Sequence, residues 1–256
     1  MNNQTYFHTL AFFGSVTNGV SNMAIAMVND QIVTPNSSNQ ALMPQQGQLR
    51  AGVASSANLQ RMRINTPSLR NIGLPYVAPV NNGLTVQSPP NIWDPGRLGP
   101  VIPKSDAISL EGTQGGGAAE NAVAALWLSF GRQEIPQGQE YRLRFTASVT
   151  CSAGTWVNGA ITFDSTLPAG VYAVTGLDVQ GTNLYLARMV FAGGSWRPGC
   201  LARNTLSSWQ HPFWTRGDLG VYGTFDSVNT PTMDFLSTGA CTAQEGYMDV
   251  VRIGDR

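Results

Sequence analysis

The chain has 256 residues and carries 15 basic and 15 acidic side chains, which gives a formal net charge of zero at pH 7. Charged residues make up only 12% of the sequence, against roughly 25% in an ordinary soluble domain, so the dense positive charge that direct nucleic-acid binding requires is missing. The two histidines are far apart and the three cysteines are widely spaced and odd in number, so neither a zinc motif nor a disulfide framework appears, and buried free thiols are expected.

The first 49 residues contain a single formal charge, Asp30. The stretch from 10 to 27 is uncharged but is interrupted by asparagine and glycine, whereas a spanning helix needs about 20 predominantly apolar residues. Two interpretations stay open: core strands or an arm along a neighbouring subunit, and a segment that touches a lipid surface. The residues expected to make such arm or membrane contacts are Phe7, Leu10, Phe12 and Phe13.

Residues 50–120 form a second, proline-rich region. The alternation of apolar and polar residues over 59–65 predicts a strand with one wet or interfacial face. Eight prolines between 67 and 103 exclude a continuous helix, because proline lacks the N–H donor and clashes with the preceding turn. We therefore expect extended chain with short strands over 66–105. The glycine-rich segment 113–121 is predicted to be a hinge or turn between two β units.

From residue 121 onward, apolar and β-branched runs recur, with glycine- or proline-bearing turns between them. These runs lie at 123–130, 141–151, 155–163, 170–179, 183–192, 219–225, 232–237 and 247–253. Eight such runs predict an antiparallel jelly roll or another β-sandwich. Near Tyr141, apolar residues alternate with Arg142 and Arg144, which fixes the strand register because a slip by one residue would bury the arginines.

The connection 193–218 is long for a compact domain and concentrates aromatic and arginine side chains. Lys104 is the only lysine, so the other basic residues are arginines, although a codon bias is an alternative reason for that ratio. Protein–protein interfaces are enriched in arginine and aromatic residues and depleted in lysine. The segment thus predicts a subunit interface, with a cluster that pins the loop to its own sandwich as the alternative. The predicted interface residues are Trp196, Arg197, Arg203, Trp209, Phe213, Trp214 and Arg216.

Sequence motifs for catalysis are missing. GxSxG, the P-loop ending in GK[ST] and HExxH do not occur. His211, Asp218 and a nearby serine can be assembled into a triad on paper, but no nucleophile elbow supports it. We therefore predict no catalytic residues, no metal site and no cofactor.

The strand series from LWLSFG to MDVVRI, with the aromatic loop WRPGCLARNTLSSWQHPFW, resembles the jelly-roll capsid proteins of tailless icosahedral viruses, including membrane-containing bacteriophages. The resemblance covers about residues 120–256. It implies a virion location, self-assembly without catalytic residues, and trimeric capsomers whose subunits carry two jelly rolls side by side. It also implies contacts with other virion proteins and, in membrane-containing viruses, with an internal lipid membrane.

The expected fold is therefore all-β, an antiparallel jelly-roll sandwich with two jelly rolls side by side. Its expected parts are an N-terminal arm or first strands (1–49), a proline-rich N-terminal β unit (50–120) and a C-terminal jelly roll (121–256). For the N-terminal half, a proline-rich wall or an arm beneath neighbours is the alternative.

The first functional hypothesis is a major capsid subunit. The alternative is a carbohydrate-binding or adhesion module, because lectin domains share the jelly-roll architecture and Trp93, Trp196 or Trp214 would stack on sugar rings. An enzyme on a β-sandwich is the least favoured class, because a cupin-type metal site needs several clustered histidines.

Overall fold

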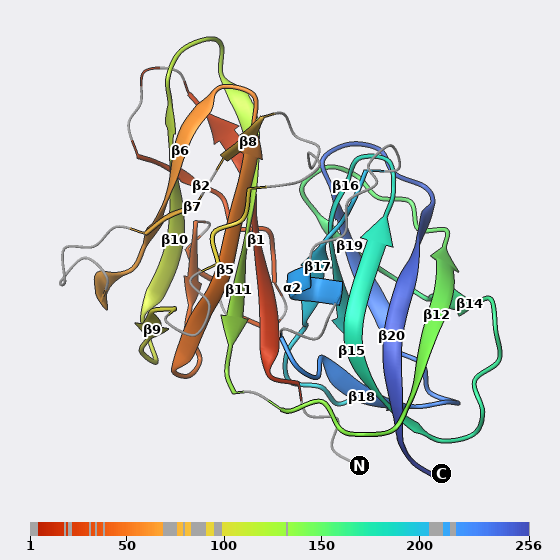
Figure 1. Cartoon of the computed structure of the whole chain (residues 1–256). Coiled ribbons are helices and arrows are strands. Elements are labelled where there is room, and N and C mark those ends of the chain that lie inside the picture. Colours follow the sequence, from red (N-terminus) through yellow and green to blue (C-terminus); the bar gives the residue numbers. More distant parts are fainter. Residues whose placement is uncertain are drawn as a thin grey trace. The chain divides into compact units, whose positions relative to one another are not determined.

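The computed structural model of the chain describes residues 5–17, 19, 22–30, 32–33, 35–37, 39–68, 76–78, 80–82, 91–94, 99–131, 133–204, 212–215 and 219–255. Of the elements whose bounds it defines, all are β-strands except the short helix α2 (Pro212–Thr215). The strands form four sheets in two compact units (Figure 1). Unit 1 comprises residues 1–9 and 131–256, and unit 2 comprises residues 10–130.

Unit 2 contains two sheets. The first has the strand order β1–β11–β5–β8, with β9 also paired to β5; the strands are β1 (Phe7–Val16), β11 (Glu120–Ser129), β5 (Gly47–Ser56), β8 (Val80–Asn82) and β9 (Val101–Ile102). The second has the order β3–β4–β10–β6–β7, with β2 also paired to β10; the strands are β3 (Pro35–Ser37), β4 (Gln40–Leu42), β10 (Ala107–Gln114), β6 (Leu59–Asn65), β7 (Tyr76–Ala78) and β2 (Met23–Ile25). The parallel pairing of β5 with β8 is an exception to the antiparallel pattern.

The strands of unit 2 show two kinds of burial, each readable from the sequence. In β6, Met62 and Ile64 are buried and Arg61 is exposed, so the predicted alternation is confirmed over 61–65. At the start of the strand it fails, because Leu59, expected on the exposed face, is buried and Gln60 is exposed, next to a register shift in the pairing with β10. In contrast, β11 is buried on both faces over most of its length and reads as an almost continuous apolar run.

Unit 1 also contains two sheets. The first has the order β14–β12–β20–β15–β18; its strands are β14 (Thr162–Phe163), β12 (Gln139–Ala147), β20 (Gln244–Gly254), β15 (Val171–Gln180) and β18 (Gly223–Asp226). The second has the order β13–β19–β16–β17; its strands are β13 (Trp156–Gly159), β19 (Thr232–Ser237), β16 (Leu184–Val190) and β17 (Gly199–Leu201). Every pairing between these strands is antiparallel.

In the first sheet of unit 1, β12 and β20 have one apolar face and one polar face, whereas β15 is buried on both faces. Leu143 on β12 lies directly opposite Met248 on β20, and both are buried. Arg142 and Arg144 project to the opposite, exposed side. The register predicted from the alternation near Tyr141 is therefore confirmed, because the arginines stay out of the core.

The antiparallel all-β prediction is confirmed, but the first strand of the predicted C-terminal region has a different partner. The run 123–130 becomes most of β11, and Leu126 of that strand pairs with Gly52 of β5. Since β5 belongs to unit 2, the boundary between the units falls between residues 130 and 131 and not at 120–121. The glycine-rich turn before β11 connects two sheets of unit 2, with Gly117 in the left-handed region at φ 85°.

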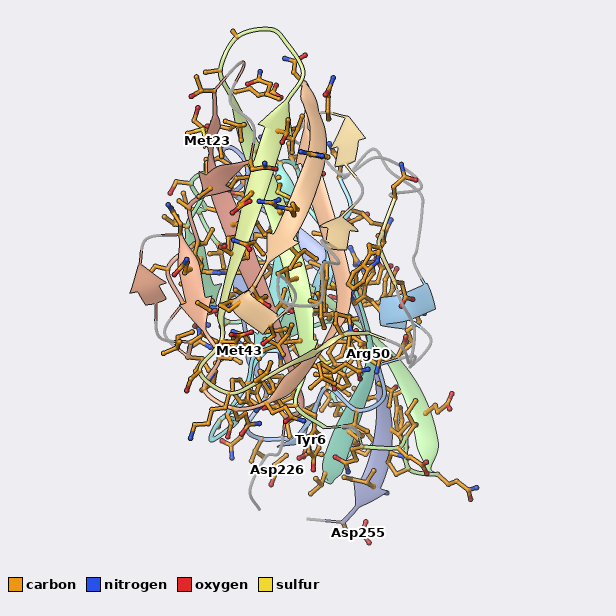
Figure 2. All side chains as sticks on the ribbon, turned by 90° about the vertical axis from the view of Figure 1, so that its left-hand side faces the viewer. Tyr6, Met23, Met43, Arg50, Asp226 and Asp255 are labelled. Carbon is orange, nitrogen blue, oxygen red and sulfur yellow. The ribbon has the colours of Figure 1, made fainter. Side chains whose placement is uncertain are left out.

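Side chains fill both units densely (Figure 2). Met43 and Arg50 lie among packed neighbours and are almost fully buried, whereas Asp255 stands at the edge with 90% of its side chain exposed. Within the described residues, no helix has the length and apolar character needed to cross a membrane.

Candidate interaction surface

The predicted arm residues lie on β1. Phe7, Leu10 and Phe12 have no exposed surface, and Phe13 is half-buried. This is the placement that the core-strand interpretation of the N-terminal region describes. Fully buried side chains offer no surface to a lipid or to a neighbouring subunit, so among these four residues only Phe13 retains one.

The predicted aromatic interface is described in part. Trp209 and Arg216, and the side chain of Phe213, lie outside the described residues. Trp214 on α2 is only 2% exposed, and its backbone oxygen accepts a 3.2 Å hydrogen bond from the Tyr222 hydroxyl. Trp214 is therefore part of the packing of unit 1 itself.

Two arginines of unit 1 share one buried carboxylate. Asp234 on β19 accepts hydrogen bonds from Arg188 at 2.8 Å and from Arg197 at 2.6 Å. Asn158 donates to its other oxygen at 2.9 Å. The Arg188 side chain is 1% exposed, and its guanidinium lies 4.1 Å from the centroid of the Trp156 ring. Buried charges need such pairing because their desolvation is otherwise strongly unfavourable.

The beginning of β1 is bound to the same region. The backbone N–H of Trp196 donates to the Thr5 hydroxyl at 2.8 Å, and that of Arg197 donates to His8 Nδ1 at 3.2 Å. Arg188 donates to the backbone oxygen of Thr9 at 3.2 Å. Residues 5–9 thus stabilise the first part of the aromatic connection, where Trp196 and Arg197 stay half-buried.

Arg203 also pairs inside unit 1. Its guanidinium contacts both oxygens of Asp178, at 2.7 and 3.0 Å, and both residues are buried. The predicted interface arginines 197 and 203 therefore bind carboxylates of their own chain. The bidentate geometry that suits arginine to interfaces suits it equally to buried ion pairs.

An exposed cluster of arginine and tyrosine lies on the polar side of β12 and β20. We call it the Arg–Tyr face; it comprises Arg142, Arg144, Glu245, Tyr247 and Asp249. The Arg142 guanidinium lies 4.9 Å from the centroid of the Tyr247 ring, in cation–π geometry. Tyr247 is 37% exposed, which is high for a large aromatic side chain within a sheet.

Ion pairs hold the arginines of this face in place. Arg144 donates to Asp164 at 2.7 Å and to Glu245 at 2.8 Å. The hydrogen bond from Arg144, followed by one from Gln180, lowers the pKa of Glu245 below its ordinary value. The Arg–Tyr face is therefore charged at neutral pH and already organised before any partner binds.

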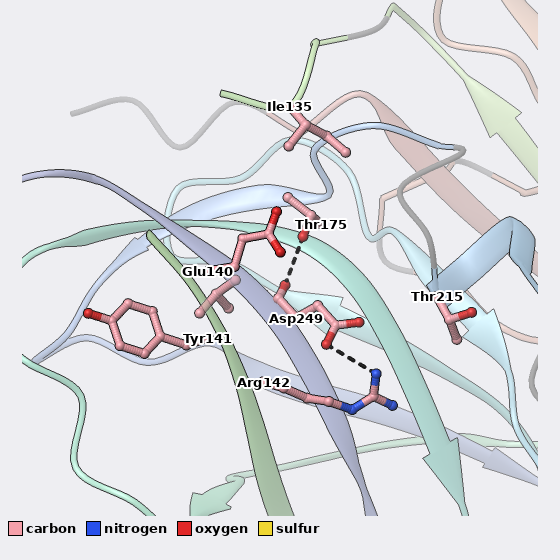
Figure 3. A pocket seen from close by; sticks show the side chains of 8 residues that line it. Ile135, Glu140, Tyr141, Arg142, Thr175, Thr215 and Asp249 are labelled. Atoms are coloured by element: carbon pink, nitrogen blue, oxygen red, sulfur yellow. Dashed lines mark hydrogen bonds and ion pairs between the residues drawn. The ribbon is translucent and has the colours of Figure 1, made fainter. Parts of the chain in front are cut away.

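A pocket of about 460 Å³ opens beside this face (Figure 3). Its lining residues are Ile135, Glu140, Tyr141, Arg142, Thr175, Thr215, Asp249 and Val250. Burial raises the pKa of the Asp249 carboxyl, and the nearby Arg142, at 3.4 Å, opposes that rise. Carboxylates, hydroxyls and one phenol ring make the pocket suited to a ligand rich in hydroxyl groups.

In the part of the chain that the structure describes, no three histidine, cysteine, aspartate or glutamate side chains are grouped to hold a metal ion. Comparisons with known protein families, with curated proteins and with solved structures found no match to this chain.

Sequence reasoning did not select the Arg–Tyr face as a site. Its signal was present, because the alternation near Tyr141 places Arg142 and Arg144 on one face of a strand. The partner residues Glu245, Tyr247 and Asp249 lie about a hundred positions further on. Only the pairing of β12 with β20 brings them together.

Proposed function

We propose that this chain is a virion structural protein, a self-assembling major capsid subunit that forms trimeric capsomers. The observation that carries the proposal is the presence of two β units in one chain, each built from two sheets. In the capsid proteins that the sequence resembles, each subunit carries two jelly rolls. We propose further that each of the two sandwich-like units is one jelly roll.

The Arg–Tyr face is the proposed contact with a second copy of the chain. Arginine and tyrosine are enriched at protein interfaces, where a few such residues supply most of the binding energy. The face carries both signs of charge, with Arg142 and Arg144 beside Glu245 and Asp249, so another copy can present complementary groups. Its ordering by ion pairs within the chain reduces the entropy lost on association.

Other virion proteins, and an internal lipid membrane where the virion has one, are the further proposed partners. A net charge of zero supports a role in which another component contacts the genome. The chain is proposed to act without catalysis and without a cofactor.

The test is the assembly state of the purified full chain. Sedimentation velocity at micromolar concentration and negative-stain electron microscopy should show trimers or larger shells. The double substitution Arg142→Ser with Tyr247→Ser should raise the dissociation constant about tenfold or more, because it removes a stacked arginine–tyrosine pair. Val101→Ser is the matched control, since Val101 is 53% exposed on unit 2 and lies outside the Arg–Tyr face. Monomers of the unmodified chain at these concentrations would contradict the proposal.

A carbohydrate-binding or adhesion module is the second candidate, and the pocket beside the Arg–Tyr face is the observation that favours it. Its carboxylates and hydroxyls match sugar hydroxyl groups, and Tyr141 offers a ring for stacking. Among the tryptophans first considered, Trp214 is buried, while Trp93 and Trp196 are half-buried. Calorimetric titration with a panel of glycans tests this candidate: saturable binding that Glu140→Gln abolishes would favour it over the capsid subunit.

A further inference from the structure

Two cysteines of unit 1 face each other across an antiparallel bridge. The N–H of Cys151 donates to the backbone oxygen of Cys241 at 2.7 Å, and the N–H of Cys241 donates back at 3.3 Å. A pair that exchanges both bonds has its Cα atoms about 5.5 Å apart, within the roughly 4.4–6.8 Å range of disulfide-bonded cysteines. Directly opposed residues also place their side chains on the same side of the ladder.

The two sulfur atoms converge on one amide group. Nε2 of Gln244 lies 3.2 Å from Sγ of Cys241 and 3.8 Å from Sγ of Cys151. The same amide is fixed by Val149, to whose oxygen it donates at 2.8 Å and from whose N–H it accepts at 3.0 Å. The side chain that contacts both thiols is therefore held in one orientation.

Both thiols lie just beneath the surface. Cys151 is 3% exposed and Cys241 is 2% exposed, yet each is followed directly by an exposed residue, Ser152 or Thr242. Small local movements of these turns would give a small reagent access to the sulfur atoms. The third cysteine, Cys200, is fully buried on β17 opposite Ala187.

We propose that Cys151 and Cys241 form a thiol–disulfide exchange site, which a low-molecular-weight disulfide such as oxidised glutathione converts into an internal disulfide bond. This proposal does not depend on the proposed capsid role.

The two thiols have unequal roles in the exchange. The hydrogen bond with Cys151 lowers the pKa of Cys241 to about 6; burial opposes this shift and the Gln244 amide adds to it. The same thiol pairing, together with burial, raises the pKa of Cys151. At neutral pH Cys241 is therefore the thiolate and the attacking nucleophile, while Cys151 holds its proton.

The reaction balances in two steps. The Cys241 thiolate attacks one sulfur of the glutathione disulfide, the S–S bond breaks, and one glutathione thiolate leaves. Cys151 then loses its proton to solvent and attacks the Cys241 sulfur of the mixed disulfide, which releases the second glutathione thiolate. Two cysteines are oxidised by two electrons in total, and one glutathione disulfide is reduced to two thiols.

The bond would join two crossings between the sheets of unit 1. Cys151 lies on the connection from β12 to β13, and Cys241 lies on the connection from β19 to β20. Both connections run between the sheet that contains β12 and β20 and the sheet that contains β13 and β19. A disulfide here closes the long segment between them and restricts the unfolded chain, so oxidation should raise the Tm.

The test treats the purified full chain with oxidised glutathione and follows it by intact mass and by peptide mapping. The unmodified chain should lose the mass of two hydrogen atoms, yield a linked peptide that contains Cys151 and Cys241, and melt at a higher temperature. Cys151→Ser should stop at the mixed disulfide and gain one glutathione group on Cys241, because no resolving thiol remains. Cys200→Ser, the matched control, should still form the linked peptide.

Two results would overturn the proposal. One is a chain that keeps three titratable thiols after this oxidation and denaturation. The other is a linked peptide that contains Cys200. If Cys151→Ser or Cys241→Ser fails to fold, the Cys200→Ser chain still tests the proposal, because it contains only the two proposed partners. A linked peptide from that chain supports the proposal, and two titratable thiols after oxidation overturn it.

Discussion

At the scale of single residues, the charges of unit 1 are organised around carboxylates that accept from arginines. Asp234 is the clearest case, because two guanidinium groups and one amide meet there below the surface. Asp234→Ala should lower the free energy of unfolding by about 3–5 kcal/mol, since Arg188 would stay buried without its partner. Chemical denaturation followed by tryptophan fluorescence measures this loss.

Asp164→Asn is the matched control for that experiment. Asp164 pairs with Arg144 on the exposed side of the sheet, where solvent screens the interaction. Its substitution should leave the denaturation midpoint nearly unchanged. Equal losses of unfolding free energy in the two variants would show that the buried Asp234 cluster stabilises the fold no more than an exposed ion pair does.

The pKa of Cys241 supplies a second prediction at this scale. Because the pKa of Cys241 is lowered to about 6, its thiolate is present at neutral pH, whereas an ordinary cysteine thiol titrates near ~8.5. In the Cys200→Ser chain, the first alkylation by iodoacetamide should follow pH with a midpoint near 6. A midpoint at the ordinary value would remove the reason for naming Cys241 as the nucleophile.

The role of individual arginines could be predicted only in part from the sequence. Arginine is suited to bidentate pairing with carboxylates, and Arg203 has that geometry with Asp178, whereas Arg188 and Arg197 both donate to one oxygen of Asp234. No local sequence pattern shows whether the carboxylate partner of an arginine lies in the same chain or in a neighbouring one. Asp234 is 37 positions from Arg197, and only strand pairing determines that they meet.

At the scale of elements, β20 lies centrally in its sheet and pairs with both β12 and β15. Its Gly246 faces the backbone oxygen of Asp178 and the ring of Phe145, so an added Cβ would overlap both. Gly246→Ala should therefore destabilise unit 1 by about 1–3 kcal/mol through forced strand displacement. Thermal unfolding followed by circular dichroism measures the effect.

The same strand provides the control. Gly254 ends β20, and an added Cβ there meets no atom within 4 Å. Gly254→Ala should leave the Tm close to that of the unmodified chain. A comparable fall in Tm for both variants would mean that crowding at Gly246 is not the cause.

The strands themselves were predictable because alternation and turn residues are local signals. The run 59–65 forms β6 with those bounds, and the later runs each overlap at least one strand. The partners of the strands were not predictable, since pairing joins residues far apart in sequence. For this reason β11 was assigned to the wrong region, although its own limits were nearly right.

At the scale of the whole molecule, the absence of net charge predicts how assembly responds to salt. Arg144 already contacts two carboxylates of its own chain, and the formal net charge is zero, so long-range attraction contributes little. The dissociation constant between copies should change less than about tenfold between roughly 0.05 and 0.5 M NaCl. Sedimentation across this salt series measures the dissociation constant. A steep rise of the dissociation constant with salt would show that charge pairs, and not apolar and stacking contacts, dominate the interface.

The discontinuous make-up of unit 1 has a consequence for biosynthesis. Residues 10–130 form unit 2 as one continuous stretch, so during translation that unit can reach its native pairing early. Residues 5–9 emerge before it but find their hydrogen-bond partners at Arg188, Trp196 and Arg197 only after those residues have left the ribosome. Until then, residues 5–9 lack these hydrogen-bond partners, which makes this segment of the nascent chain a candidate for chaperone binding.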